Sequence, residues 1–137
     1  MAATKNDTTF PVTRTDAEWQ TELTPQQYEV LRGHGTEMRG TSALNKEKRL
    51  GTFRCAGCGQ LLFDAGTKFD SGTGWPSFDA PIDGAVETTV DRSHFMVRTE
   101  AHCSRCGGHL GHVFDDGPTR TGLRYCMNGV AMKFEPR

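Results

Sequence analysis

Two stretches, Cys55-Ala-Gly-Cys58-Gly59 and Cys103-Ser-Arg-Cys106-Gly107, each place two thiols on a tight turn. The glycine after each second cysteine lets the backbone fold so that its amides face the sulfurs. Two such turns supply four soft ligands, which favours one structural Zn²⁺ per chain over a redox pair, since one pair would suffice for redox chemistry. The interval between the turns exceeds the ~15–20 residues of a compact zinc ribbon. We therefore expect the metal to join distant strands and staple the fold.

The composition limits the classes of protein to which the chain can belong. Its 137 residues are enough for one domain with a hydrophobic core. The 16 basic and 17 acidic side chains give a formal charge of −1, so nothing favours a phosphate backbone, and no nucleic-acid partner is expected. No apolar run approaches the ~18 residues that a membrane span requires, and no membrane partner is expected.

The cysteine count and the first residues indicate the compartment. Five cysteines, four of them in two C-x-x-C pairs, point to metal or redox chemistry in a reducing compartment rather than to a disulfide framework. The first residues lack the apolar segment of a secretory signal, and Asp7 argues against an Arg-rich transit peptide. We therefore expect a cytoplasmic protein.

The chain is expected to divide into a polar arm and one domain. Residues 1–14 are predicted to be a disordered arm, and residues 15–137 a single domain. Capping-box patterns, in which Ser or Thr is followed three residues later by Glu or Gln, begin at Thr15 and Thr24. They predict two short helices within residues 15–33.

From residue 51 onward, short runs of β-branched and aromatic residues alternate with turn signals. No helical pattern lies between the runs, which argues against βαβ units. The pattern predicts a mainly β core over residues 51–136, arranged as an antiparallel sandwich or barrel. The predicted strands are 52–55, 60–63, 86–90, 94–99, 110–114, 122–128 and 130–135.

Cys126 is the one thiol outside the two pairs. In Arg124-Tyr-Cys126-Met-Asn128 the side chains of Arg124, Cys126 and Asn128 share one face of a strand. Arg124 would favour the thiolate, and Asn128 could donate a hydrogen bond to an oxygen beside the sulfur. A lone cysteine in a β core is also commonly a small buried hydrophobe. These residues alone do not decide between a nucleophile and a core thiol.

The segment His109-Leu-Gly-His112 supplies imidazoles, the side chains that exchange protons near neutral pH. Positions three apart in a regular strand face opposite ways, so both rings can serve one site only if Gly108 or Gly111 permits a bulge or bend. The pair could instead bind a metal, but no third ligand stands nearby in the sequence. Acid–base chemistry or substrate contact is the favoured role.

The loop Gly72-Thr-Gly-Trp75-Pro-Ser-Phe78 presents two aromatic rings between glycines and a proline. The rings could form one wall of an apolar pocket. Composition alone favours ordinary core packing for them, because large aromatic side chains dominate cores in general.

Four ordered motifs together resemble the peptide methionine-R-sulfoxide reductases, the B type of this enzyme. The resemblance runs from about Thr24 to Phe134. The motifs are Cys55-Ala-Gly-Cys58, Lys68-Phe-Asp-Ser-Gly-Thr-Gly-Trp-Pro-Ser-Phe78, Cys103-Ser-Arg-Cys106-Gly-Gly-His109-Leu-Gly-His112-Val-Phe114-Asp-Asp-Gly-Pro118 and Gly122-Leu-Arg-Tyr-Cys126-Met-Asn128. The resemblance implies two antiparallel β-sheets with short N-terminal helices, and Zn²⁺ held away from the active site by Cys55, Cys58, Cys103 and Cys106.

The resemblance also implies an activity and a role for each candidate residue. Such an enzyme repairs oxidative damage by reducing the R epimer of methionine sulfoxide in polypeptides. Cys126 would attack the sulfoxide sulfur and keep the oxygen as a sulfenic acid. The residues that would bind and polarise the oxygen or tune the thiolate are His109, His112, Asn128 and Arg124. The residues that would receive the substrate's methyl group are Trp75, with Phe78 and Phe114 nearby.

Thr73 departs from the pattern of many relatives, which carry a recycling cysteine in this loop. With four thiols on Zn²⁺ and Cys126 in catalysis, no thiol remains for an internal disulfide. We therefore expect a one-cysteine cycle in which thioredoxin, or glutaredoxin with glutathione, reduces the sulfenic acid. The alternative from a different class is a non-catalytic zinc-stapled β-domain that binds a peptide or a small ligand.

Overall fold

The computed structural model describes residues 10–137. The predicted disordered arm falls largely on residues 1–9, which lie outside the described residues. Residues 10–14 lie against the second cysteine turn: the Val12 N–H donates to the Arg105 carbonyl at 2.9 Å, and the Phe10 ring meets His102 edge-on at 5.8 Å. Within the described residues, Phe10 and Val12 are therefore held against this turn.

Two short helices precede the sheets. α2 (Asp16–Glu22) and α3 (Pro25–Leu31) each begin with a complete capping box, and this prediction is confirmed. Helices this short depend on packing for their stability, and they bury Trp19 and Leu31. No helix within residues 10–137 is long and apolar enough to cross a membrane.

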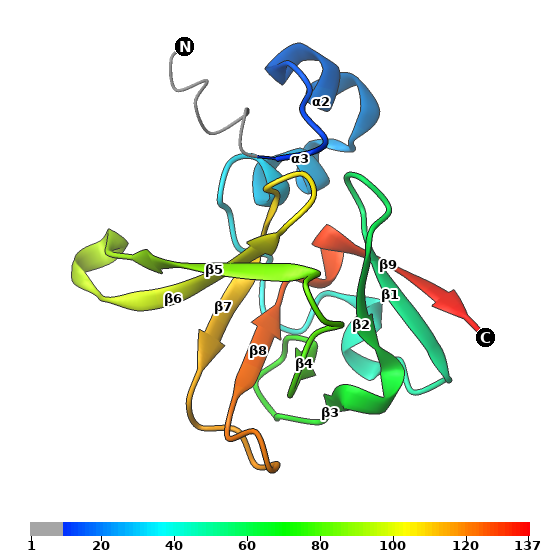
Figure 1. The fold of residues 1–137 in the computed structure, drawn as a ribbon, viewed down its shortest axis with the longest axis vertical. Helices are drawn as coiled ribbons and strands as arrows, with labels where there is room; N and C mark the ends of the chain where they lie inside the picture. Colours follow the sequence, from blue (N-terminus) through cyan, green and yellow to red (C-terminus); the bar gives the residue numbers. More distant parts are fainter. Residues whose placement is uncertain (1–9) are drawn as a thin grey trace.

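Within the described residues, the strands form two antiparallel sheets (Figure 1), and the predicted mainly β fold is confirmed. The three-stranded sheet has the order β2-β1-β9, and the six-stranded sheet has the order β3-β4-β8-β7-β6-β5. The strands are β1 (Gly51–Cys55), β2 (Leu61–Asp64), β3 (Lys68–Phe69), β4 (Ser77–Phe78), β5 (Val86–Asp91), β6 (Arg98–Cys103), β7 (His109–Phe114), β8 (Arg124–Met127) and β9 (Met132–Pro136). Short 3-10 turns are η1 (Ala43–Lys46), η2 (Ala65–Thr67), η3 (Ser93–Phe95) and η4 (Gly129–Ala131).

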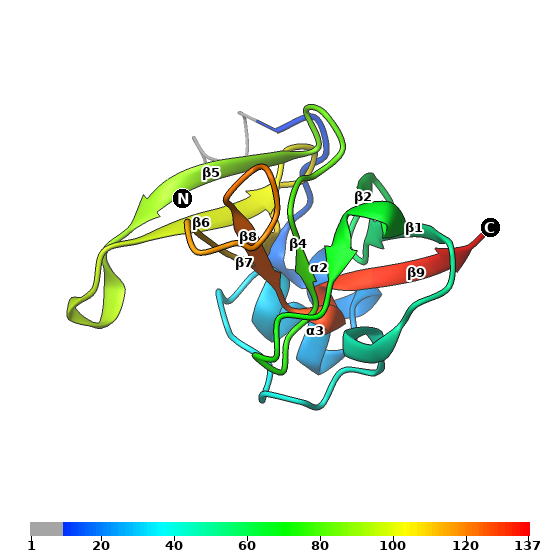
Figure 2. The same ribbon diagram turned by 90° about the horizontal axis from the view of Figure 1, so that it is seen from below.

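One predicted strand is wrong. The apolar run Phe95-Met-Val97 suggests a strand over 94–99. In the structure these side chains are exposed at the tip of the β5–β6 hairpin, where η3 ends at Phe95, and β6 begins only at Arg98. β3 and β4, two residues each, are too short to leave a periodic signal in the sequence. Figure 2 shows the β5–β6 hairpin projecting away from the three-stranded sheet.

Phenylalanine rings join the two sheets. Phe53 of β1, Phe63 of β2 and Phe78 of β4 are fully buried. Phe78 stacks on Phe63 with ring centroids 4.2 Å apart and meets Phe53 edge-on at 5.0 Å. Such pairs contribute about 0.5–1.5 kcal/mol each beyond area burial. The prediction of Phe78 as a substrate contact is therefore corrected: its ring belongs to the core, because β4 turns it toward the three-stranded sheet.

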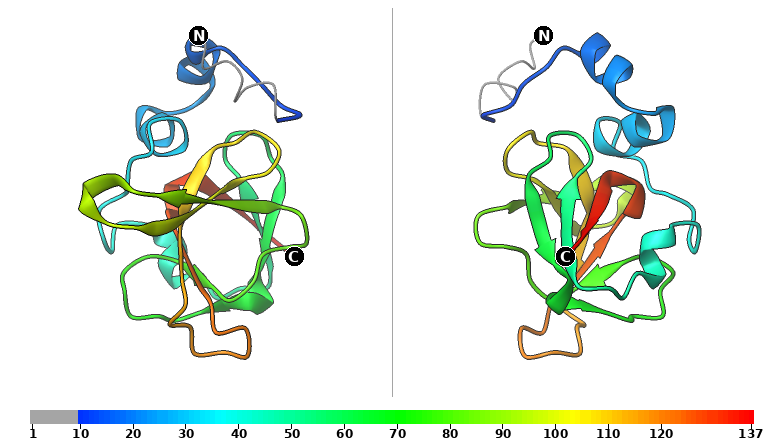
Figure 3. Two further views of the ribbon diagram at one scale, coloured as in Figure 1. Left: turned by 60° about the vertical axis from the view of Figure 1, so that its left-hand side comes forward. Right: turned by 90° about the vertical axis from the view of Figure 1, so that its right-hand side faces the viewer.

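The two cysteine turns lie at the helical end of the molecule (Figures 1 and 3). One turn connects β1 to β2 in the three-stranded sheet, and the other connects β6 to β7 in the six-stranded sheet. The helical segment packs on both, because Arg32 donates to the Cys106 carbonyl at 2.9 Å and Trp19 lies beside Gly57. The connection between β7 and β8 lies at the opposite end (Figure 3).

Strand β7 carries one extra residue. Ala101 of β6 lies opposite Gly111, but His102 lies opposite His109, so Leu110 forms a bulge. The bulge changes the alternation of side chains and brings the rings of His109 and His112 to 5.4 Å, centroid to centroid. The structure therefore meets the condition under which both imidazoles can serve one site.

We expect Gly111→Ala to lower the free energy of unfolding by about 2–3 kcal/mol, because an added Cβ would lie 2.1 Å from the Cys126 carbonyl oxygen and force β7 away from β8. Urea unfolding measures the change. Gly66→Ala is the matched control, since its Cβ would meet only the end of the Asp64 side chain, at 3.0 Å. Equal stabilities for the two variants would contradict the close approach of β7 and β8.

Candidate active site and metal centre

The four paired cysteines converge in one cluster. The Sγ atoms of Cys55 and Cys106 lie 3.7 Å apart, those of Cys58 and Cys103 lie 3.6 Å apart, and all four lie within 4.8 Å of one another. A disulfide requires ~2.05 Å between sulfurs, whereas a tetrahedral ion with metal–sulfur bonds of ~2.3 Å holds its sulfurs about 3.8 Å apart. The cluster therefore has the geometry of a four-thiolate metal site.

Neighbouring N–H groups support these sulfurs. The Gly57 amide donates to Cys55 Sγ at 3.4 Å, and Gln60 Nε2 donates to Cys103 Sγ at 3.4 Å. Gln60 also donates to the Ala85 carbonyl at 2.9 Å, so it fixes the first turn against the strand pair that carries the second. Contacts of this kind orient metal ligands and disperse their charge.

Cys126 opens on a separate cavity of about 120 Å³. The residues that line it are Thr36, Trp75, Arg98, Gly111, His112, Phe114, Cys126 and Asn128. His112 of β7 lies directly opposite Cys126 of β8 in the sheet. The cavity thus combines a thiol, an imidazole, a guanidinium, an amide and two aromatic rings, and five of the predicted site residues share it.

The environment of the Cys126 thiol acts in two directions. Burial raises its pKa, while the charge of Arg124 and a hydrogen bond with the Thr73 side chain oppose the rise. Arg124 is held by Asp116, with Nε 2.8 Å from Oδ1, and its guanidinium lies 4.5 Å over the Phe114 ring. Because the ordinary pKa of a thiol is already ~8.5, Cys126 is mostly protonated at neutral pH and needs a base.

A carboxylate holds His112. Its Nε2 lies 2.8 Å from Asp91 Oδ2, which also pairs with Arg98 Nη2 at 3.4 Å. A carboxylate only accepts hydrogen bonds, so this contact assigns the hydrogen to Nε2 and leaves Nδ1 with a lone pair. Burial lowers the pKa of His112 although Asp91 opposes it. At neutral pH the ring is therefore neutral and able to accept a proton.

His109 lies behind the cavity lining and is only 2% exposed. Its Nδ1 lies 2.8 Å from Glu100 Oε2, and its Nε2 is buried without a protein partner among the described residues. His34 approaches the same carboxylate oxygen, with Nε2 at 3.3 Å. His34, Glu100 and His109 therefore form a second group of side chains, distinct from the cysteines, that could also hold an ion.

Asn128 is fixed at both ends of its side chain. Its Nδ2 donates to the Leu110 carbonyl at 3.0 Å, and its Oδ1 accepts from the Glu37 N–H at 2.9 Å. The second Nδ2 hydrogen is left to an oxygen in the cavity. Glu37 also positions the aromatic wall, because its carbonyl accepts from Trp75 Nε1 at 3.1 Å, and its side chain accepts from the Val130 N–H at 2.9 Å.

Sequence reasoning missed the residues that hold this machinery in place, namely Thr36, Glu37, Asp91, Arg98 and Glu100. Asp91 and Arg98 face each other across the β5–β6 hairpin, and Glu100 lies opposite His112. Arg98 and Glu100 alternate along β6. This pattern could have indicated a polar face of the strand, but only with the correct bounds of β6.

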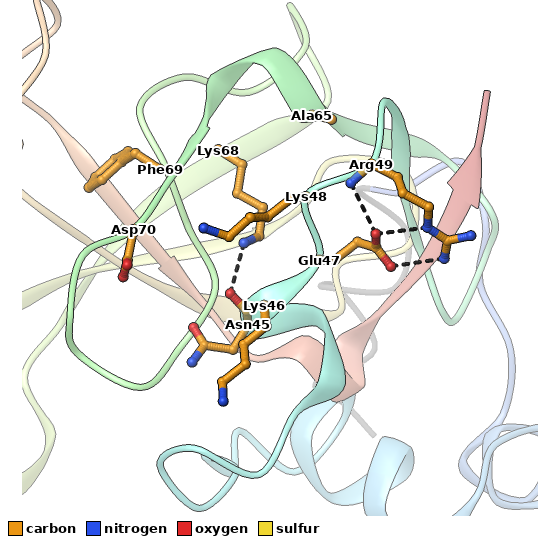
Figure 4. Close-up of a pocket in the computed structure, with 9 residues that line it drawn as sticks. All are labelled: Asn45, Lys46, Glu47, Lys48, Arg49, Ala65, Lys68, Phe69 and Asp70. Atoms are coloured by element: carbon orange, nitrogen blue, oxygen red, sulfur yellow. Dashed lines mark hydrogen bonds and ion pairs between the residues drawn. The ribbon is translucent and has the colours of Figure 1, made fainter.

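A larger cavity, of about 450 Å³, lies elsewhere (Figure 4). Its lining residues are Asn45, Lys46, Glu47, Lys48, Arg49, Ala65, Lys68, Phe69 and Asp70. Lys68 Nζ donates to the Asn45 carbonyl at 2.9 Å, and Arg49 binds Glu47 at 2.9 Å. None of these residues is a cysteine or a histidine, so its greater volume does not make it the reactive site.

The chain is similar to known proteins over most of its length. The SelR domain profile matches residues 23–136. The chain is 55% identical over 127 residues to "Peptide methionine sulfoxide reductase MsrB" of Leptospira interrogans, covering 92% of this chain and 97% of that protein. It is 53% identical over 133 residues to the protein of the same name from Agrobacterium fabrum, covering 96% and 98% of the two chains.

A solved structure shares part of the fold. The Mis18 "Yippee-like" domain superposes with a TM-score of 0.53 at 19% sequence identity, covering 65% of this chain and 98% of that domain. This likeness concerns the fold alone.

Losing the metal is expected to unfold the protein. Structural thiolate sites supply about 10 kcal/mol or more of folding free energy, against a total stability of about 5–15 kcal/mol for a domain. We expect Cys106→Ser to lose the ion and its cooperative thermal transition. Cys126→Ser, the control, should retain one ion per chain by metal analysis. A stable, metal-free Cys106→Ser protein would contradict the role of the cluster.

Removing the Arg124 guanidinium should raise the pKa of the Cys126 thiol further. The charge of Arg124 lowers the pKa of Cys126 against the effect of burial, so Arg124→Gln should move the alkylation profile with iodoacetamide to higher pH and slow the reaction at neutral pH. Arg120→Gln removes an equal charge from an exposed side chain of the same connection. The interpretation fails if both variants shift the profile equally.

Proposed function

The chain belongs to the SelR domain family, whose relatives carry the name peptide methionine sulfoxide reductase MsrB, and on this premise we propose that it reduces methionine sulfoxide in peptides and proteins to methionine. The observation that carries the proposal is the Cys126 thiol, which opens on one small cavity together with His112 and Asn128. Reduction of a sulfoxide needs a thiol next to its sulfur and hydrogen-bonding groups next to its oxygen.

The first step activates the thiol. The neutral His112 ring accepts the proton of Cys126, and Asp91 stabilises the imidazolium through Nε2–H. Arg124 favours the thiolate that results. The proton then leaves His112 for the sulfoxide oxygen, which the free N–H of Asn128 also binds. A protonated, hydrogen-bonded oxygen makes the sulfoxide sulfur electrophilic.

The second step transfers the oxygen. The Cys126 thiolate attacks the sulfoxide sulfur and forms a sulfur–sulfur bond. The protonated oxygen then shifts from the substrate sulfur to Cys126 Sγ as the substrate's sulfur–oxygen bond and the new sulfur–sulfur bond break, which leaves Cys126 as a sulfenic acid. Methionine leaves with the electron pair. The thiol is oxidised and the sulfoxide is reduced, so the step needs no further reactant.

The cavity supports a preference for one epimer, and the resemblance to the family implies that it is R. The substrate's methyl group would lie between Trp75 and Phe114, and its oxygen toward Asn128 and His112, which line the same cavity. With the methyl group and the oxygen of a chiral sulfur assigned to different sides, the mirror-image epimer would direct its oxygen to the aromatic wall. His109 acts on the sulfoxide oxygen from its position behind His112.

An external thiol completes the cycle. Thr73 is hydrogen-bonded to Ser71 at 2.8 Å and lies beside Cys126, where a recycling cysteine would otherwise stand. The other four cysteines are gathered in the metal cluster. Thioredoxin, or glutaredoxin with glutathione, therefore attacks the sulfenic acid directly.

The metal in the cluster is Zn²⁺ in this proposal. Four thiolates without an open position suit a closed structural zinc site, and the ion's role is to hold the two sheets together. A cytoplasmic location follows from the same chemistry, since these thiols must stay reduced to bind the ion.

A single-turnover experiment tests the proposed function. Metal-loaded protein without reductant is mixed with each separated epimer of a peptide methionine sulfoxide. We expect about one equivalent of methionine per chain from the R epimer alone, and none from Cys126→Ser, which should keep its metal and fold. Turnover by Cys126→Ser, or no methionine from the wild type even with a dithiol present, would overturn the proposal.

A further inference from the structure

The side chain of His109 is built into the fold with one nitrogen committed. The ring is 2% exposed, and Nδ1 lies 2.8 Å from Glu100 Oε2. Because a carboxylate can only accept, Nδ1 carries the hydrogen and the other nitrogen, Nε2, is the one that can gain or lose a proton. Nε2 is buried without a protein partner among the described residues. A buried nitrogen without a hydrogen-bond partner destabilises the fold, so its retention indicates a use.

A second histidine holds the carboxylate from outside. His34 Nε2 lies 3.3 Å from Glu100 Oε2, and its ring lies 5.2 Å from that of His109. His34 adopts a left-handed backbone conformation with φ of 59°, which is uncommon for a residue with a side chain. Strained backbone persists where the surrounding structure requires it. In this conformation the imidazole lies within ion-pair distance of Glu100.

We infer that Glu100, supported by His34, is a positioning residue that fixes the tautomer and orientation of His109, so that Nε2 is the nitrogen that serves the sulfoxide oxygen. This inference rests on the proposed function. It adds to that function the two residues that prepare the second imidazole. Glu100, His34 and His109 all lie outside the cavity lining. Glu100 contacts His109 directly, and His34 contacts Glu100, so both act through His109.

The charges around the group agree with this role. The pKa of Glu100 is held below its ordinary value: burial works against ionisation, but the hydrogen bonds from His109 and His34 outweigh it. The bond to Glu100 raises the pKa of His34. Glu100 is thus a carboxylate throughout the neutral range. The other charged and titratable groups that face these side chains are Arg32, Asp91 and His112.

The arrangement repeats the one at His112 with the ring reversed. Asp91 holds Nε2 of His112, whereas Glu100 holds Nδ1 of His109. The free nitrogens are therefore Nδ1 in one ring and Nε2 in the other. Each imidazole keeps a single exchangeable position, and the rings meet edge-on at 5.4 Å.

The test replaces Glu100 by Gln, which keeps the shape and removes the charge and the one-way acceptor. We expect the single-turnover rate with the R epimer to fall at least about tenfold, as for loss of an oriented acid–base group. The substrate concentration that gives half of the maximal rate should change by less than about twofold. Nitrogen NMR of ring-labelled protein should show the His109 hydrogen moved, wholly or partly, from Nδ1 to Nε2. Glu100→Asp should restore the tautomer.

The matched control is Glu87→Gln. Glu87 pairs with His102 at 3.5 Å in the same sheet, away from the cavity, so the variant removes an equal charge from another Glu–His contact. It should leave the rate and the His109 tautomer unchanged. His34→Gln should lower the single-turnover rate less than Glu100→Gln does.

Two results would overturn the inference. Glu100→Gln could lower the melting temperature while the His109 tautomer and the pH profile of the single-turnover rate stay as in the wild type, which would make Glu100 merely structural. The tautomer could instead change without any effect on the rate, which would remove His109 from the reaction. A wild-type protein that produces no methionine would refute the proposed function instead, and the NMR result would still stand.

Discussion

The close pairing of β7 with β8 is the constraint on which the site depends. At Gly111 the two backbones approach so closely that a single added carbon would lie 2.1 Å from the Cys126 carbonyl oxygen. This approach places Cys126 opposite His112. The bulge at Leu110 then turns His109 to the same side and directs the Leu110 carbonyl to Asn128. A thiol, two imidazoles and an amide therefore share one small region of two adjacent strands.

The cysteine cluster and the Cys126 cavity lie in different parts of the fold. The four cysteines come from both sheets and meet at the helical end, whereas the residues that line the cavity come mainly from β7, β8 and the loops that cover them. A closed four-thiolate site has no open position for a substrate. The loop around Glu37 complements this division, because it orients Trp75 and Asn128 from outside the sheets.

Much of this could be predicted from the sequence, because it depends on local spacing. The cysteine pairs, the capping boxes and the face shared by Arg124, Cys126 and Asn128 are all short-range patterns. Strand register is not local, so the carboxylates that hold the imidazoles could not be found. Asp91 and Glu100 reach His112 and His109 only through the pairing of β5, β6 and β7. Phe78 shows the converse. The resemblance implied a place near the substrate's methyl group, whereas composition favoured the core, and its partners are core rings.

The central claim is that oxygen moves from the substrate to Cys126. A peptide methionine sulfoxide labelled with heavy oxygen on its sulfur, mixed with protein in ordinary water without reductant, tests it by intact mass spectrometry. The account predicts that Cys126 gains one heavy oxygen atom for each methionine released. An unlabelled oxygen on Cys126 would show that it came from water, and methionine released with no oxygen on Cys126 would contradict the claim altogether.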